Sequence, residues 1–524
     1  MQAISIDIGT SGIRGQLLDL RRRKVLRTCL TSRNPLPGAN VMDHLDFAME
    51  QGLALAHEVL IGAVRQIINV LDPASLERIA VCGNPIQISL FEGIEIRDLA
   101  YAGKNKLRSQ GIEPPDRRGH IANGGSLGLG VDVEVLIPPA IRHEIGADAL
   151  AMMLKSGFLE GDRCMVTDYG TNAEMALKVG DDIYTGSAAA GPAIEGQSIK
   201  AGMLASPGAI SDIIHTPEGW QTLVLDDRLE PQGGALIGLR SNALKLRGLR
   251  AKGITGTGVI ALICAGSEMG RVILPRITGG DILLDRGVRF TTADLLEVGK
   301  AIGAIRAGHM TLMVEAGLDP GSLGTMFMAG ASGTYVDARK AQSVGMVPAL
   351  ASRIVQMGNT SLELAKDLAV EPELLDRLND MRSHLLARHV MFATSPTFSD
   401  IYLQELAFWT EGMPRERYLN NLASLGVPVP VPPREPTIIE RRRRTDIWEV
   451  GGSLDIIDIS VRLEGSWECN RCLRCVKACP ERALTQKSDR FMVDTGRCLG
   501  TACRRCEEAC PQRRFSFSEM MLEG

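Results

Sequence analysis

A short motif, Asp-x-Gly-Thr-[Ser/Asn], occurs twice in this chain of 524 residues and restricts its possible folds more than any other feature. The first copy begins at Asp7 and the second at Asp168. Each copy follows an apolar stretch and leads into another apolar stretch, which predicts a strand, a tight Gly-rich hairpin and a second strand. Two such units predict an α/β protein with two duplicated lobes that face each other.

The composition of the two hairpins suits the binding of phosphate groups. Gly, Thr and Ser offer backbone N–H groups and hydroxyls to anionic oxygens without a bulky side chain in the way. The Asp at each strand end can hold Mg²⁺ through water or orient an attacking water molecule. Two facing hairpins of this kind predict a clamp for the phosphates of a nucleotide. The alternative is that each Asp only forms a turn.

A third Gly-rich segment fits the same kind of site. An apolar stretch, Thr325 to Ala329, predicts a strand that enters Gly330-Ala331-Ser332-Gly333. A loop without bulky side chains can approach a flat base and a ribose closely, although it can also be a simple tight turn. The chain has no Gly-x-x-x-x-Gly-Lys-[Ser/Thr] sequence, so it is not a P-loop enzyme.

The cysteines are unevenly distributed along the chain. Eight of the 12 lie between Cys469 and Cys510. Disulfide scaffolds are usually small and secreted, with cysteines throughout, so this distribution predicts a cytoplasmic protein with a metal or cluster module. The other four, Cys29, Cys82, Cys164 and Cys264, are scattered, and the last three lie in apolar stretches where we expect small buried residues.

The cysteine-rich tail contains two quartets, each followed by Pro. Cys469-x2-Cys472-x2-Cys475-x3-Cys479-Pro has the spacing of bacterial ferredoxins. Cys498-x4-Cys503-x2-Cys506-x3-Cys510-Pro repeats it with a first gap that is two residues longer. The spacing predicts two [4Fe–4S] clusters in an α+β ferredoxin-like domain. Four thiolates could instead bind zinc, but zinc sites usually pair two Cys-x2-Cys units across a longer loop.

In two-cluster ferredoxins the fourth cysteine of each run ligates the other cluster. One expected ligand set is therefore Cys469, Cys472, Cys475 and Cys510. The other expected set is Cys479, Cys498, Cys503 and Cys506. The longer gap affects Cys498, and a three-iron cluster would remain if that residue did not ligate.

Charge and hydropathy limit the possible partners. The chain has a formal net charge of −4, but its tail from Cys469 onward has a net charge of +4. This division indicates either two modules of separate origin or a tail that docks an acidic partner. No segment reads as about 20 apolar residues, which predicts no membrane span. The run Arg441–Arg444 lacks interleaved aromatic residues, which argues against a nucleic-acid site.

The same patterns predict where the domains begin and end. Residues 46–71 have the pattern of one long amphipathic helix, and residues 426–433 are rich in Pro. We expect a first lobe over 1–160 with an inserted subdomain at about 93–141, a second lobe with closing elements over 161–425, a Pro- and Arg-rich linker over 426–460, and the ferredoxin-like domain over 461–524.

The three Gly-rich motifs resemble the two phosphate motifs and the adenosine motif of the actin, heat-shock chaperone and sugar-kinase superfamily. Residues 188–196, 202–210, 253–262 and 344–348 resemble one branch in particular, the ATP-dependent reductive activators of corrinoid proteins. The resemblance covers nearly all of residues 1–415. It implies ribonuclease-H-like lobes and an ATP site. The C-terminal pair of ferredoxin motifs resembles the type of activator that serves methylamine methyltransferases.

The resemblance also implies roles for the motif residues. Asp7 and Asp168 are the expected catalytic residues, positioning Mg²⁺ and the attacking water. The expected ATP contacts are Gly9, Thr10, Ser11, Gly170, Thr171, Asn172, Gly330, Ala331, Ser332 and Gly333. The implied reaction reduces a Co(II) corrinoid protein to Co(I), with electrons from a low-potential donor such as a ferredoxin passed through the two clusters.

Three alternative functions stay open on the sequence. The first is an ATP-dependent activator of a radical dehydratase, although such activators usually hold one cluster between two subunits. The second is a small-molecule kinase with a regulatory iron–sulfur domain. The third is a non-catalytic ferredoxin scaffold, which would show no ATPase activity.

Overall fold

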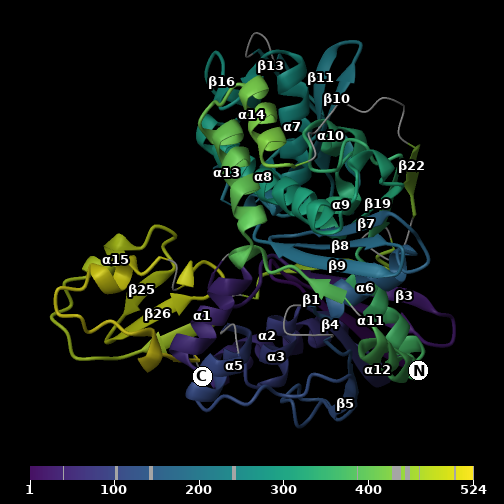
Figure 1. Cartoon of the computed structure of the whole chain (residues 1–524). Helices are drawn as coiled ribbons and strands as arrows, with labels where there is room; N and C mark the ends of the chain where they lie inside the picture. The colour runs from purple at the N-terminus through teal and green to yellow at the C-terminus, as the bar shows by residue number, and fades with distance from the viewer. Residues whose placement is uncertain are drawn as a thin grey trace. The chain divides into compact units, whose positions relative to one another are not determined.

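The chain divides into two units of dense contacts in the computed structural model. The structure describes residues 1–38, 40–100, 104–140, 145–196, 198–238, 243–385, 387–427, 438–442, 449–459, 461–500 and 503–522. The first unit contains Met1–Leu150, Ser361–Leu385 and Glu449–Gly524. The second contains Ala151–Thr360 and Leu386–Trp448. Each unit is described by itself below (Figure 1).

The first unit is built on a seven-stranded sheet with the order β23-β3-β2-β1-β4-β6-β5. Its strands are β1 (Gln2–Ile8), β2 (Ile13–Asp19), β3 (Lys24–Thr31), β4 (Leu76–Gly83), β5 (His120–Asn123), β6 (Glu134–Ile137) and β23 (Leu454–Ile457). The strand β1 lies in the middle, antiparallel to β2 and parallel to β4. The first predicted strand–hairpin–strand unit is therefore present.

The second unit repeats this arrangement. Its seven-stranded sheet has the order β21-β9-β8-β7-β19-β20-β22. Its strands are β7 (Cys164–Tyr169), β8 (Ala173–Val179), β9 (Asp182–Ala188), β19 (Thr325–Ala329), β20 (Arg353–Gly358), β21 (Ala387–His389) and β22 (Ile438–Arg441). As with β1, the motif strand β7 is antiparallel to the next strand and parallel to β19. The two sheets confirm the predicted duplication.

Helices accompany both sheets and pack either on the strands or on one another. In the first unit they are α1 (Val41–Gln51), α2 (Leu53–Leu71), α3 (Pro85–Glu92), α11 (Thr360–Val370) and α12 (Leu374–His384). In the second unit they are α7 (Gly256–Glu268), α8 (Thr292–Glu315), α9 (Gly330–Tyr335), α10 (Ala338–Ser343), α13 (Pro396–Thr410) and α14 (Arg415–Ser424). The helix α6 (Ala147–Ser156) crosses from one unit to the other.

A second sheet of the second unit has the order β13-β12-β11-β10-β14. Its strands are β10 (Ala209–Thr216), β11 (Gly219–Leu225), β12 (Pro231–Ile237), β13 (Leu244–Lys245) and β14 (Gly253–Ile254). The buried helix α7 contacts β10 of this sheet and contributes to the large apolar core of the unit.

The predicted helix over residues 46–71 is two helices instead of one. Helix α1 ends at Gln51 and α2 begins at Leu53, because Gly52 has a φ of 106°, which a continuing helix cannot adopt. By length and composition, α2 is the one helix of the described residues that could cross a membrane. Its buried face, which includes Val59, Leu60 and Ile67, packs in the core of the first unit.

Three predicted boundaries differ from the units that the structure forms. The segment predicted as an insertion supplies β5 and β6, and β6 pairs in parallel with β4, so it completes the first sheet. The predicted linker gives one edge strand to each sheet, β22 beside β20 and β23 beside β3. Residues 361–385, predicted in the second lobe, contact the first unit. Residues 428–437 and 443–448 of the linker lie outside the described residues.

The cysteine-rich tail forms a small α+β domain within the first unit. Its sheet has the order β25-β26-β24-β27, with β24 (Arg462–Gly465), β25 (Leu484–Lys487), β26 (Arg490–Asp494) and β27 (Met521–Leu522). Two short helices, α15 (Arg474–Ala478) and α16 (Arg505–Glu508), carry cysteines. Trp467 stacks on Phe491 with ring centroids 4.7 Å apart. The tail lies beside α1 in Figure 1, where Arg504 pairs with Glu50.

Candidate functional site

The first phosphate hairpin is a tight turn between β1 and β2. A Cβ at Gly9 would lie 2.8 Å from the carbonyl oxygen of Gly12, so no side chain fits at that position. The backbone N–H of Ile13 donates to the Thr31 hydroxyl at 2.8 Å. These contacts fix the backbone shape of the hairpin, as a cradle for anionic oxygens requires.

Two asparagines, which the sequence analysis did not single out, support this hairpin from behind. Asn34 is buried, and its amide donates to the carbonyl of Gly9 at 2.8 Å. The N–H of Asn34 also donates to the carbonyl of Ser11 at 2.9 Å. Asn84 caps α3 and donates to the Thr10 hydroxyl at 3.1 Å. Neither asparagine belongs to a motif, so only the fold reveals them.

A second carboxylate accompanies Asp7 in the first unit. Asp7 is partly exposed at the end of β1, opposite Cys82 of β4 in the sheet register. Asp148 lies in the first turn of α6, where burial and, to a smaller extent, the nearby Asp7 carboxylate raise its pKa to about 6. Two neighbouring carboxylates of this kind are typical Mg²⁺ ligands. The sequence analysis missed Asp148.

The second hairpin, which we predicted to bind phosphate, has two of its donors already paired. Thr171 is buried between β7 and β8, and its N–H donates to a carboxylate oxygen of Glu195 at 3.1 Å. The Thr171 hydroxyl donates to the same oxygen. The carboxylate of Glu195 therefore takes two of the donors that we predicted for phosphate, both of them on Thr171. Glu195 is a further site residue that the sequence analysis did not assign.

The structure brings the third Gly-rich segment against the second Asp. In the pairing of β19 with β7, Ala329 stands opposite Asp168, and Gly330 follows with a φ of 78°. A Cβ at Gly330 would lie 2.1 Å from Oδ1 of Asp168, so only glycine fits there. We expected residues 330–333 to form a loop, but they begin the helix α9. The side chains of Ala331 and Ser332 lie outside the described part.

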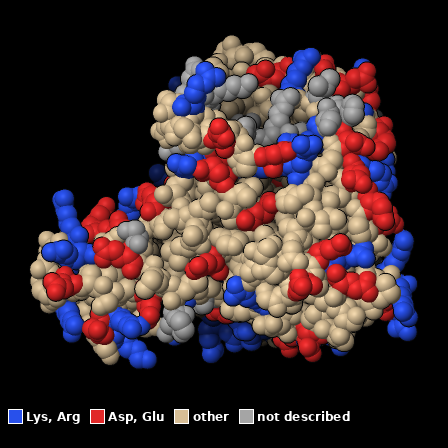
Figure 2. Space-filling model, turned by 90° about the horizontal axis from the view of Figure 1, so that it is seen from below, with Lys and Arg blue, Asp and Glu red and all other residues tan. Residues whose placement is uncertain are grey.

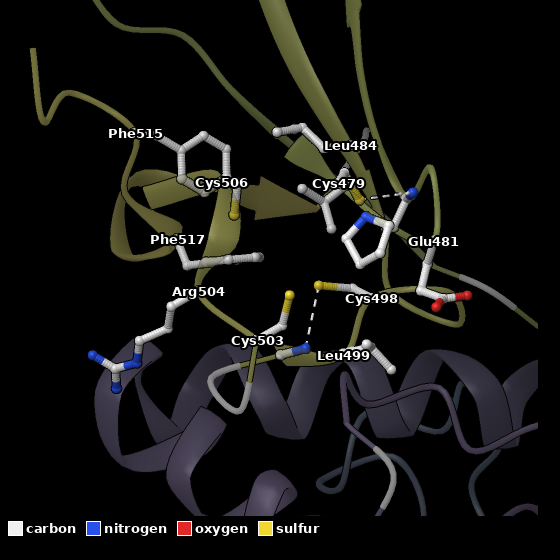
Figure 3. A pocket seen from close by; sticks show the side chains of 14 residues that line it. Cys479, Glu481, Leu484, Cys498, Leu499, Cys503, Arg504, Cys506, Phe515 and Phe517 are labelled. Atoms are coloured by element: carbon white, nitrogen blue, oxygen red, sulfur yellow. Dashed lines mark hydrogen bonds between the residues drawn. The ribbon is translucent and has the colours of Figure 1, made fainter. Parts of the chain in front are cut away.

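Four of the predicted cluster ligands surround one pocket in the tail. The pocket is an open hollow of about 380 Å³, and its lining includes Cys479, Cys498, Cys503 and Cys506. Apolar side chains, among them Leu484, Phe515 and Phe517, complete the wall (Figure 3). This is the predicted set in which Cys479 of the first run joins three cysteines of the second. We call it the inner quartet.

The other four cysteines form what we call the outer quartet. It consists of Cys469, Cys472, Cys475 and Cys510. Cys475 is buried in α15, whereas Cys472 is exposed. Cys475 and Cys510 are also close enough for one thiolate to affect the pKa of the other. All eight cysteines have free thiols.

The backbone around the two runs repeats itself. Leu473 follows the second cysteine of the first run with a φ of 56°, and Arg504 occupies the equivalent place in the second run with a φ of 45°. The N–H of Ala483 donates to the sulfur of Cys479 at 3.2 Å. At the equivalent place in the second run, the N–H of Arg514 donates to the sulfur of Cys510 at 3.3 Å. The tail is thus an internal repeat.

Backbone N–H donors to sulfur are the chemistry that iron–sulfur ligands require, because they stabilise thiolate charge and set the cluster potential. The two quartets differ in this respect. Burial raises the pKa of Cys498 and of Cys506 to about 12. Burial also acts to raise the pKa of Cys510, but backbone N–H groups of residues 512–515 lower it overall. Both sets of residues fit a cluster, the inner one in drier surroundings.

Within the described residues, no three His, Cys, Asp or Glu side chains form a group that could hold a single metal ion. Figure 2 shows Lys and Arg interspersed with Asp and Glu over the tail on the face in view. Of the scattered cysteines, Cys82 and Cys164 are buried as expected, whereas Cys264 is only partly buried.

Two family models match most of the chain. The one described as the RACo middle region matches residues 2–160, and the one described as the C-terminal domain of RACo, the ASKHA domain, matches residues 162–419. A solved structure described as a reductive activator for a corrinoid, iron–sulfur protein has a TM-score of 0.64 at 21% identity. It covers 78% of this chain and 66% of its own length, and it supports the fold.

Two curated relatives of this chain are named for their action on corrinoid proteins. A corrinoid activation enzyme, RamQ, of Eubacterium limosum is 25% identical over 77% of this chain and 70% of its own. The [Co(II) methylated amine-specific corrinoid protein] reductase of Methanosarcina barkeri is 48% identical over 523 residues, which is 96% of each chain. At that identity and coverage, the chain belongs to the RACo family, and both curated relatives are named for the reduction or activation of corrinoid proteins.

Proposed function

We propose that this chain is an ATP-dependent reductive activator that returns a corrinoid protein from Co(II) to Co(I). The observation that carries the proposal is the 48% identity, over 96% of the chain, to a reductase named for the Co(II) form of a methylated amine-specific corrinoid protein. The corrinoid protein of a methylamine system, or of a system for a related methyl donor, is accordingly the substrate.

The duplicated hairpins bind the nucleotide in this proposal. Asp7 and Asp168 position Mg²⁺ and the attacking water. The backbone N–H groups of the two hairpins cradle phosphate oxygens, and residues 330–333 receive the adenosine. Glu195 has to release Thr171 before the second hairpin can offer both of its donors to phosphate. Asp148 adds a second carboxylate beside Asp7.

The cysteine tail is the electron-transfer module. The outer and inner quartets each hold one [4Fe–4S] cluster, and such clusters, when bound, supply one-electron transfer at low potential, at the extreme roughly −700 mV. The cobalt takes up one electron, which a low-potential donor such as a ferredoxin loses. Cluster-bound cysteines in this number suit the reducing cytoplasm, where we place the protein.

The other candidate functions are less well supported. An activator of a radical dehydratase and a small-molecule kinase share the ATPase fold, but the curated relatives are named for corrinoid proteins. A ferredoxin scaffold without catalysis would make no use of the two hairpins that flank Asp7 and Asp168.

The test is an anaerobic assay of the iron-loaded full chain with Mg–ATP, a chemical reductant and a Co(II) corrinoid protein. Asp168→Ala is expected to abolish ATP hydrolysis and Co(I) formation while its iron content stays that of the wild type. Full Co(I) formation by this variant would contradict the assigned role. The exposed Asp181 provides a matched control, because Asp181→Ala removes a carboxylate near the same lobe's next hairpin.

A further inference from the structure

We propose that one short segment, Arg33–Gly38, couples nucleotide binding at the first phosphate hairpin to the inner quartet. We call this segment the coupling loop. It follows β3 and precedes α1, and it contacts the hairpin at one end and the loop of Cys498 at the other. The inference rests on the proposed function, since it needs both a nucleotide at the hairpin and a cluster on the inner quartet.

The hairpin end of the coupling loop is held by Asn34. This residue is 5% exposed and uses its backbone and its side chain on the hairpin. It donates to the carbonyls of Gly9 and Ser11, at 2.8 and 2.9 Å. Its Oδ1 accepts the N–H of Leu36 at 2.9 Å, so the same side chain also fixes the start of the loop. A shift of the hairpin backbone therefore has to move or break these bonds.

The middle of the coupling loop is stiff. Pro35 and Pro37 fix their own φ angles and restrict the residues before them. Leu36, which is 1% exposed, packs in the apolar core of the first unit. From residue 34 to residue 38 an extended chain spans at most about 14 Å. A stiff and buried segment of this length transmits a displacement instead of absorbing it.

The far end of the coupling loop reaches the inner quartet. The N–H of Gly38 donates to the carbonyl of Cys498 at 3.0 Å. The guanidinium of Arg33 donates to the carbonyl of Gly496 at 3.1 Å. A Cβ at Gly500 would lie 3.1 Å from the carbonyl oxygen of Pro37, so the two backbones are in close contact. The loop thus contacts the chain both before and after Cys498.

Gly500 links this contact to the chemistry of the cluster ligand. Its N–H donates to the sulfur of Cys498 at 3.4 Å (Figure 3). Hydrogen bonds to the sulfurs and access of solvent are among the factors that set the potential of an iron–sulfur cluster. Displacement of the coupling loop therefore changes the hydrogen bond to the Cys498 sulfur and the access of solvent to it. Within the described residues, the coupling loop makes no hydrogen bond to the outer quartet.

A second contact between the first lobe and the tail makes a useful comparison. Glu50 on α1 pairs with Arg504 of the second cysteine run. Both side chains are more than 40% exposed, and the pair joins α1 directly to the second cysteine run. This pair docks the tail on the lobe without passing through Asn34. Its loss tests docking alone.

The experiment is an anaerobic redox titration of the iron-loaded full chain, followed by electron paramagnetic resonance, with and without Mg²⁺ and a non-hydrolysable ATP analogue. In the wild type, nucleotide is expected to change the reduction equilibrium of one cluster about tenfold, which for one electron is about 59 mV, and to leave the other cluster unchanged. Asn34→Ala is expected to remove most of that shift while iron content stays normal.

Two further variants keep the test decisive. Arg33→Ala changes an exposed side chain, so it should fold even if Asn34→Ala does not. It is expected to reduce the shift by roughly half, because one of the two hydrogen bonds to the loop of Cys498 is lost. Glu50→Gln should keep the full shift. Coupling by this loop is refuted if nucleotide binds and shifts nothing, if Asn34→Ala and Arg33→Ala keep the full shift, or if Glu50→Gln removes it equally.

The proposed function fails in a distinguishable way. Binding of a fluorescent ATP analogue and the iron content of the wild type are measured in the same samples. Absence of nucleotide binding or of iron would overturn the proposed function and the coupling together. Normal binding, normal iron and normal Co(I) formation without any potential shift would overturn the coupling alone.

Discussion

The two lobes share one topology but secure their phosphate hairpins differently. In the first lobe, Asn34 donates to the carbonyl of Gly9 and Asn84 donates to the Thr10 hydroxyl. In the second lobe, Glu195 occupies the N–H and the hydroxyl of Thr171 from the site itself. The duplicated fold therefore contains one hairpin that is preformed and one that has to be released.

This difference suggests a division of labour. A hairpin that is joined to the cysteine tail through the coupling loop can transmit the binding of nucleotide to the tail. A hairpin whose donors are held by a carboxylate can respond to it, because an incoming phosphate competes with Glu195 for the same two donors. The predictions below test this comparison, beginning with the largest expected effect.

The largest effect is expected from the two motif aspartates. Asp168→Asn should lower ATP hydrolysis about a thousandfold, because it removes the carboxylate that orients water or Mg²⁺ in its lobe. Asp7→Asn should cost roughly tenfold less, since Asp148 provides a second carboxylate in the first lobe. Steady-state ATPase rates measure both. Equal losses would mean that the lobes contribute alike, and Asp181→Asn should leave the rate unchanged.

The glycines beside the aspartates should show the next effect. A Cβ at Gly330 would lie 2.1 Å from Asp168 Oδ1, and its φ of 78° disfavours any other residue. We expect Gly330→Ala to weaken nucleotide binding about 100-fold, or about 2.7 kcal/mol. Gly9→Ala, with a clash at 2.8 Å, should cost only about tenfold. Titration with a fluorescent ATP analogue measures both, and the opposite order would contradict the structure.

Smaller effects of opposite sign are expected from the residues that hold the hairpins. Glu195→Gln should strengthen ATP binding about fivefold, because it removes a negative charge that competes with phosphate for Thr171. Asn84→Ala should weaken binding about threefold, because the Thr10 hydroxyl loses a donor that orients it. Calorimetric titration with Mg–ATP compares them. Weaker binding in both variants would mean that Glu195 supports the site and does not compete for it.

The last effect concerns the stability of the nucleotide-free first lobe instead of nucleotide binding, and it depends on pH. The folded pKa of Asp148 is raised to about 6, so its contribution to stability is present at low pH and is lost as pH rises through about 6. Asp148→Asn should therefore raise the free energy of unfolding by about 1–2 kcal/mol above pH 6. At pH 5 the gain should be roughly half as large. Thermal unfolding in chelator, without nucleotide, measures this, and a gain that does not vary with pH would argue against burial as the cause.

Part of this molecule could be predicted from its residues. The duplicated lobes follow from two copies of one motif between apolar stretches, and both copies occupy equivalent places in the sheets. The pairing of Cys479 with the second run follows from the ferredoxin spacing, and the structure places these cysteines around one hollow. Motifs of this kind are local, so the sequence displays them directly.

The missed features depend on contacts between distant segments. Glu195 lies 24 residues from Thr171, and Asn34 lies 25 residues from Gly9, without a motif that connects them. The edge strands β22 and β23 were predicted as linker because short strands in a charged region show little alternation of apolar and polar residues. They form only by pairing with the edge of a sheet. Residues 330–335 form a helix that begins directly after β19, beside Asp168. Their small side chains alone do not predict this helix.

The central claim is that one chain couples a nucleotide clamp to two clusters in order to reduce cobalt. The visible spectrum of a Co(II) corrinoid protein from a methylated-amine system tests it most directly, after anaerobic mixing with the iron-loaded chain and a low-potential reductant. We predict conversion to the Co(I) spectrum with Mg–ATP and little conversion without it. An unchanged Co(II) spectrum in the presence of ATP, or equal conversion without ATP, would contradict the account.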